Sequence, residues 1–234
     1  MIYGETGRLP IAITIKTRMI CFWHKISCKY NTNLSNTLYK VLYELNNKEL
    51  YKSKWLTYIK NILIECGLPY IFNNPSSVSS LQLKNIIKKS LSDQYIQNWN
   101  SAVNQLTSCI NYKIFKTCFI SEPYLTFLPN HLMHSFCRFR LRNFKLPITL
   151  NMFNRNHPKL CSLCETNKIG DELHYLLECP YFKESRKDHI KKHFYTHPNT
   201  LKFQSLLSAK SPKMIYKVAS FCHKIEKHFN STYN

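Results

Sequence analysis

Three cysteines and one histidine lie close together in the sequence, at spacings that suit a metal ion. They are Cys161, Cys164, His174 and Cys179, arranged as C-x2-C, nine further residues and H-x4-C. Zinc prefers four soft or borderline ligands in a tetrahedron, and Cys3His is one of its common structural ligand sets. Because four protein ligands leave no open coordination position, we expect one structural zinc ion. The alternative is four unrelated residues, with the thiols buried as small hydrophobes.

The residues around these ligands predict how the chain positions them. The C-x2-C spacing allows a tight turn to aim both sulfurs at one point. Asp171 follows a glycine and is suited to N-cap a short helix that carries His174 inward. Pro180 disfavours helical backbone at the preceding residue, so Cys179 should lie where that helix ends.

Two basic segments flank this group and are candidates for nucleic-acid contact. The first is a helix predicted over 130–143, in which Arg138, Arg140 and Arg142 alternate near the end. The second is a helix predicted from Pro180. Its basic residues are Lys183, Lys187 and Lys191 at i, i+4 and i+8, with Arg186 beside them. Arginine forks suit phosphate groups, and a basic row suits a nucleic-acid backbone. The alternative is that both are solvated faces of core helices.

The metal-binding segment resembles the zinc-binding segment at the C-terminal end of LINE-type (non-LTR) retrotransposon reverse transcriptases. The likeness rests on Cys161-Ser-Leu-Cys164 and on the run from Gly170 through Cys179 to Phe182. Residues 129–140 with 145–148 resemble the stretch preceding that segment, and 4–10 with Arg18 and Trp23 resemble the stretch after the polymerase domain. Where such proteins carry a Glu and a Gly-Arg pair, this chain has 149–153, and Phe144 replaces a polar or histidine position.

The resemblance implies a non-catalytic, nucleic-acid-binding part of such an enzyme, as a truncated copy or a fragment. Polymerisation needs paired aspartates for two Mg²⁺ ions, but the only aspartates are Asp93, Asp171 and Asp188. No Pro-Asp with a following Asp/Glu-x-Lys stands after Cys179. We therefore expect no enzyme. The alternatives are a zinc-stabilised protein-interaction module and a remnant nuclease.

Composition supports a polyanionic partner. The 234 residues include 33 Lys and Arg against 13 Asp and Glu, a net charge of +20. Such an excess favours nucleic acid, RNA or DNA, and an acidic membrane surface only second. Residues 1–30 lack the apolar run and small-residue cleavage site of a secretory leader, and no apolar span of 18 residues exists, so we expect neither a leader nor a membrane span. The ten cysteines therefore indicate a reducing, intracellular compartment, nuclear or cytoplasmic. We expect no membrane partner and no small-molecule substrate.

Apolar periodicity predicts a mainly α fold, a helical bundle with a small zinc-pinned module in the C-terminal half. The expected domains are 1–125, helical, and 126–234, the zinc module with flanking helices. Helices are predicted over 10–28, 33–49, 53–66, 80–107 and 130–143, and from 180 and 211. The predicted core of the first domain comprises Ile15, Met19, Phe22, Leu38, Leu42, Trp55, Ile59, Ile62 and Trp99.

Overall fold

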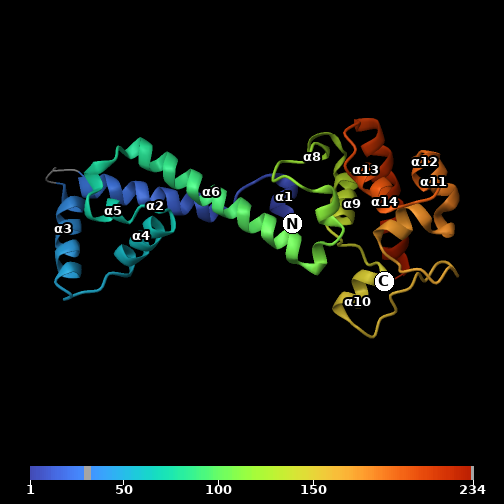
Figure 1. The fold of residues 1–234 in the computed structure, drawn as a ribbon, viewed down its shortest axis with the longest axis horizontal. Coiled ribbons are helices and arrows are strands. Elements are labelled where there is room, and N and C mark those ends of the chain that lie inside the picture. Colours follow the sequence, from blue (N-terminus) through green and yellow to red (C-terminus); the bar gives the residue numbers. More distant parts are fainter. Residues whose placement is uncertain (29–32, 233–234) are drawn as a thin grey trace. The chain divides into compact units, whose positions relative to one another are not determined.

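The structure, a computed structural model, describes residues 1–28 and 33–232 and is built almost entirely from helices (Figure 1). The β-structure among these residues consists of two isolated antiparallel bridges, Thr6 with Ser121 and Leu160 with Ile169. The predicted mainly α fold is therefore confirmed. No helix within the described ranges is both long and apolar enough to cross a membrane.

Packing divides the chain into two units. The inserted unit is Leu9–Asn98, and the main unit joins Met1–Arg8 to Trp99–Asn234. This division lies earlier than the boundary expected near residue 125. The physical reason is that Trp99, Tyr112 and other large side chains of residues 99–125 belong to the core of the main unit.

The inserted unit consists of five complete helical segments and the first part of a long helix. They are α2 (Ile11–Cys28), α3 (Leu34–Asn47), α4 (Lys54–Glu65), α5 (Pro69–Asn73), η1 (Pro75–Ser77) and α6 (Ser80–Gln105). Its core centres on Trp23, whose ring stacks on Phe72 at 5.7 Å between centroids. The indole nitrogen of Trp23 donates to the Tyr39 hydroxyl at 3.1 Å. The predicted helices are thus present with nearly the expected ends.

The predicted core of this unit is partly wrong. Ile59 and Ile62 are buried as expected, but Ile15, Phe22 and Leu38 are 51%, 56% and 58% exposed. Met19, Leu42 and Trp55 are half-buried, and Trp99 is buried in the main unit. Helix α2 carries apolar residues on several faces, so the spacing of these residues alone does not show which face is buried. Its buried face is Ile13, Thr17, Ile20, Trp23 and His24.

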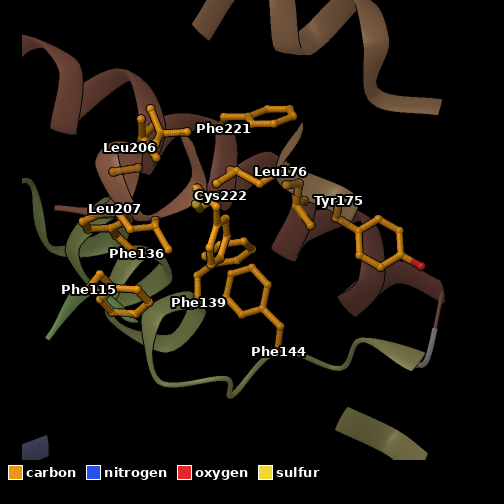
Figure 2. Close-up of a cluster of buried hydrophobic side chains, with 14 of the residues drawn as sticks. Phe115, Phe136, Phe139, Phe144, Tyr175, Leu176, Leu206, Leu207, Phe221 and Cys222 are labelled. Atoms are coloured by element: carbon orange, nitrogen blue, oxygen red, sulfur yellow. The ribbon is translucent and has the colours of Figure 1, made fainter. Parts of the chain in front are cut away.

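The main unit contains the remaining elements. They are α1 (Ile2–Thr6), η2 (Thr107–Cys109), α7 (Tyr112–Phe115), α8 (Tyr124–Phe127), α9 (Asn130–Arg140), α10 (Pro147–Phe153), η3 (His174–Glu178), η4 (Pro180–Phe182), α11 (Lys183–His189), α12 (Lys192–Tyr195), α13 (Thr200–Leu207) and α14 (Pro212–Thr232). Helices α9 and α14 pack against each other. Figure 2 shows Phe136 and Phe139 of α9 in one apolar cluster with Cys222 of α14 and Leu176 of η3. This cluster is the support on which the metal-binding segment rests.

A buried ion-pair network ties α1 to α9. The Arg140 Nε lies 3.0 Å from a carboxylate oxygen of Glu5, and its Nη2 lies 3.2 Å from Glu122. The guanidinium also lies 4.5 Å above the Phe115 ring. Because two carboxylates and an aromatic face surround it, this arginine is fully paired inside the main unit.

Candidate metal centre

The four predicted ligands converge, and we call them the Cys3His cluster: Cys161, Cys164, His174 and Cys179. Their ligand atoms all lie within 4.8 Å of one another. The Sγ atoms of Cys161 and Cys179 are 3.9 Å apart, and the Cys164 Sγ is 3.4 Å from the His174 Nε2. In a tetrahedral zinc site the ligand atoms would be about 3.5–3.8 Å apart, given the usual bond lengths. The cluster could therefore hold a metal ion, as the spacing predicts.

A short backbone ladder brings the first two cysteines into place. The Cys161 amide donates to the Lys168 carbonyl at 2.8 Å, and the Gly170 amide donates to the Lys159 carbonyl at 2.9 Å. These bonds close the intervening loop, so the C-x2-C turn lies at its start. The Leu163 amide donates to the Cys161 Sγ at 3.4 Å. An amide pointed at sulfur favours the thiolate form that metals require.

The predicted cap brings the histidine into the cluster. Asp171 Oδ1 accepts a hydrogen bond from the His174 amide at 2.9 Å, which confirms the N-cap. The helical turn η3 follows, and Cys179 ends it with φ −52° and ψ 120°. Residue 170 must be glycine here, because an added Cβ would lie 2.8 Å from the Tyr175 hydroxyl and 2.9 Å from Pro147. The last two ligands are thus separated by one short turn, as the aspartate and proline signals predict.

Electrostatics around the cluster suit metal binding. The His174 Nδ1 lies 3.4 Å from Glu178, which also pairs with Lys168 at 3.0 Å. A carboxylate on the outer ring nitrogen orients a ligating histidine and fixes its tautomer. Burial lowers the pKa of His174, which favours the neutral, ligating imidazole. Burial raises the pKa of Cys179 to about 12, so a metal ion must displace its proton on binding.

A buried hydroxyl provides an independent test of the fit. The Tyr175 hydroxyl makes no hydrogen bond among the described residues, and Figure 2 shows it pointing away from the apolar cluster. Burial, and next the neighbouring Cys161 thiol, raise the pKa of Tyr175, so this group remains a donor. A metal-bound thiolate is a better acceptor than a thiol. The orphaned donor therefore fits a Cys161 that is ionised by a metal.

Two of the predicted nucleic-acid contacts are corrected, because their side chains are internal. Arg140 is 2% exposed and held by the network with Glu5 and Glu122. Arg186 is 3% exposed and donates to the carbonyls of Leu176 at 2.8 Å and Cys179 at 2.9 Å. A charge beside buried carboxylates or carbonyls stabilises the fold and is not available to phosphate. Arg186 instead holds the backbone that carries the last ligand.

The other two arginines do not form a surface row either. Helix α9 ends at Arg140, and Arg142 follows in a left-handed conformation with φ 55°. Its Nε lies 3.6 Å from the buried Glu172. Arg138 is half-exposed and pairs with Glu226 of α14. Each arginine of this segment thus has an acidic partner in the main unit.

The lysine segment is exposed but bent. Lys183 and Lys187 belong to α11, which ends at His189, and the buried, extended Ile190 turns the chain before Lys191. The three lysines therefore do not form the one basic row on a single helix that their spacing predicted. All three lysines are nevertheless exposed. Lys187 pairs with Glu184 at 2.8 Å, while Lys183 and Lys191 have no ion pair in the part of the chain that the structure describes.

Two cavities lie on either side of these lysines and share Lys187. One, of about 380 Å³, is lined by Lys168, Leu177, Glu178, Pro180, Lys183, Arg186, Lys187, Tyr195 and Pro198. The other, of about 390 Å³, includes Lys191, Lys213 and Lys217. Sequence reasoning missed Lys213 and Lys217, although their i, i+4 spacing after Pro212 was a usable signal. The basic surface is therefore a set of lysines around two hollows.

Fold and site together define a mainly helical protein with a Cys3His cluster that could hold a metal ion. Searches against protein-family models, curated proteins and solved structures gave no match to this chain. Its function is therefore argued from the residues of the site.

Proposed function

We propose that the Cys3His cluster binds one structural zinc ion. The support is the convergence of three sulfurs and one imidazole nitrogen within 4.8 Å, since soft thiolates with imidazole favour zinc over harder cations. When bound, zinc would cross-link the ladder, the capped turn and Cys179. Four protein ligands close the coordination shell, so its role there is structural.

Elemental analysis of the purified chain tests this assignment. We expect one zinc per chain, and Cys161→Ser should lose it because a hydroxyl is a poor zinc ligand. Cys118→Ser, at an exposed cysteine outside the cluster, is the matched control and should retain zinc. Protein that contains no stoichiometric zinc, and takes up none on titration, would contradict the proposal.

We further propose that the chain binds nucleic acid without catalysis, as in the C-terminal part of a LINE-type reverse transcriptase. The observation that supports this proposal is that several of the few carboxylates are buried and paired with cations inside the main unit. Glu5, Glu172 and Glu226 are buried and paired with basic groups inside the main unit. These acids neutralise the three arginines of the α9 segment. Apart from the buried Arg186, most of the net charge of +20 therefore falls on exposed side chains. A surface of this kind attracts a polyanion.

The basic surface that we assign to nucleic acid comprises six lysines: Lys168, Lys183, Lys187, Lys191, Lys213 and Lys217. It retains the three lysines that the sequence indicates and replaces the arginines, whose groups are paired internally. Lysine contacts to phosphate carry no base information. We therefore expect affinity with little sequence preference and a steep salt dependence.

The test is Lys183→Glu, Lys187→Glu and Lys191→Glu combined in one variant of the full zinc-loaded chain. Loss of three phosphate contacts should make the slope of log affinity against log salt shallower by about two to three units. The matched control reverses Lys84, Lys88 and Lys89, exposed lysines on α6 in the inserted unit. Equal losses in both variants, or no loss in the first, would contradict this interface.

A second candidate function is protein interaction, favoured by one face of α3. Leu34, Leu38 and Val41 lie at i, i+4 and i+7 and are all more than half exposed. Such an apolar stripe is typical of a helix that packs on a partner. This function would be favoured over nucleic-acid binding if the chain binds a protein partner, if that binding does not change with salt concentration, and if Leu38→Glu abolishes it.

A further inference from the structure

One cavity combines a charged rim with an apolar floor. It lies where the end of α11, helix α13 and the start of α14 meet, and its volume is about 390 Å³. Four lysines stand on its lining: Lys187, Lys191, Lys213 and Lys217. Asp188 is the one carboxylate among the lining residues, and His189 and Ser211 add polar groups. The electrostatic character of the cavity is therefore strongly positive.

The floor is made of aliphatic side chains. Ile190 and Leu206 are buried and belong to the main core, and Met214 packs against that core while remaining partly exposed. Phosphate alone needs only the lysines, and a purely apolar ligand does not need four cations. A hollow that offers both matches a ligand with an anionic end and a flat, weakly hydrated end. Its volume falls within the range of about 300–1,000 Å³ that small-ligand pockets span.

The start of α14 adds donors to this rim. The first helical hydrogen bond runs from the Ile215 amide to the Ser211 carbonyl at 3.0 Å. Pro212 has no N–H, so the amides of Lys213 and Met214 lie at the positive end of a 21-residue helix without a helical acceptor. Such amides favour an anion, and here they reinforce lysines that already line the hollow.

His189 contributes a polar ring to the lining. Its Nδ1 lies 2.7 Å from the Ser185 carbonyl, which can only accept, so Nδ1 carries a hydrogen and Nε2 is the ring nitrogen left for a ligand. The ring is stacked on Phe221, with 5.8 Å between centroids and 24° between planes. This contact fixes the ring at the edge of the cavity.

We propose that this cavity takes one unstacked nucleotide of a single-stranded nucleic acid. The base would lie on Ile190, Leu206 and Met214, with its phosphate among the lysines of the rim. The inference rests on the proposed nucleic-acid function and names the form that is bound. Bases of a duplex are paired and stacked, so they cannot enter such a hollow. An aliphatic floor carries no hydrogen-bonding code, so any base should fit.

The test compares three probes with the full zinc-loaded chain. They are a 12-nucleotide single strand, the same sequence as a duplex, and a free nucleoside monophosphate. Burying one base on the aliphatic floor should favour the single strand over the duplex about tenfold, because a paired base cannot be buried there. The free monophosphate should compete at least 100-fold more weakly than the strand, because it lacks the phosphates that the other lysines bind. Equal competition would make this a free-nucleotide site and overturn the proposal.

Two variants separate this cavity from the general basic surface. Met214→Gln keeps the length and charge of the side chain but makes this part of the floor polar, and should weaken the preference for single strands while leaving duplex affinity unchanged. Tyr216→Gln, exposed on the same helix and outside the cavity, should behave like the wild type. Zinc content and helical circular dichroism establish that each variant is folded.

A second pair of variants keeps the proposal testable if Met214→Gln does not fold. Lys213→Met with Lys217→Met should weaken single-strand binding at least fivefold more than Lys224→Met with Lys227→Met. Both pairs remove the same charge from exposed positions on α14. Equal affinity for strand and duplex, with a steep salt dependence, would overturn the cavity assignment and leave the proposed function standing. Loss of salt dependence would overturn the proposed function itself.

Discussion

The segment of α9 and the segment of α11 are equally basic in sequence, yet the main unit uses them differently. On α9, Arg140 is buried between two carboxylates and Arg138 pairs with α14. On α11, Lys183 and Lys187 remain exposed, and the arginine of the same helix, Arg186, turns inward to backbone carbonyls. In these two segments the buried cations are arginines and the exposed ones are mainly lysines, whichever helix they belong to.

The physical reason lies in the two side chains. A guanidinium presents five donors in a fixed plane, so several buried acceptors can satisfy it at once. An ammonium group is compact and strongly hydrated, and remains in water more readily. In these two segments a count of basic residues therefore overstates the surface available to a polyanion, and the lysines are the part that remains. Elsewhere the rule is not strict, since Lys116 is buried and Arg18 and Arg155 are exposed. The following variants test this contrast, beginning with the largest expected effect.

Arg140→Met should produce the largest loss of stability. It leaves the buried Glu5 carboxylate without its cation, which costs about 3–5 kcal/mol when one partner of a buried pair is removed. Chemical denaturation of the full chain measures the change in unfolding free energy. Combining it with Glu5→Gln should recover part of the loss, because no unpaired charge is then buried. If the Arg140→Met protein were as stable as the wild type but bound nucleic acid more weakly, Arg140 would contact nucleic acid, contrary to the internal role assigned to it.

Arg186→Met should act on the metal centre. The guanidinium holds the Leu176 and Cys179 carbonyls, so its loss frees the backbone that carries the last ligand. We expect zinc affinity to fall about 10- to 100-fold, the range typical of groups that support metal ligands. Competition with a chromogenic chelator measures this. Lys187→Met, the exposed neighbour on the same helix, is the control and should leave zinc affinity unchanged.

A smaller, pH-dependent effect is expected where α9 meets α14. The Ser135 hydroxyl lies 2.8 Å from the His223 Nδ1. Burial lowers the pKa of His223, assisted by Lys227 and His131 and opposed by Glu226. Because its folded pKa lies below the unfolded value of 6.5, the unfolded chain binds the proton more readily. Stability should therefore fall as pH drops through and below 6.5.

His223→Gln should flatten this dependence between pH 7 and pH 5.5. The measurement is denaturant unfolding at each pH, with zinc content followed in parallel so that metal release is recognised. If the unfolding free energies of variant and wild type change with pH in parallel, a group other than His223 causes the loss of stability at low pH.

Local signals explain why the metal centre is predictable from the sequence. Asp171 caps the helical turn that follows it, and Pro180 ends that turn by keeping the preceding residue, Cys179, out of the helical conformation. Both act within a few residues, as does the C-x2-C spacing. Most helix ends are likewise set by local apolar periods and breaks. These parts of the structure depend little on the rest of the chain.

The buried arginines and the face of α2 could not be predicted in this way. Whether Arg140 is internal depends on Glu5, 135 residues away, and on Glu122. The inward face of α2 is selected partly by His24, whose ring nitrogens meet Ser80 and the Pro75 carbonyl at 2.9 Å. Partners this distant leave no period or spacing near the residue itself. The lysine row failed for a related reason, since the buried Ile190 ends α11 early.

The pairing of Glu5 with Arg140 has a consequence during synthesis on the ribosome. Residues 1–8 emerge before the inserted unit, but their place is in a unit whose other residues begin at Trp99. The inserted unit can complete its own core while this first segment still lacks its partner. Contacts over so long a separation form late, because the intervening chain must be closed into a loop first. Residues 1–8 are therefore made before the inserted unit and reach their final position after it.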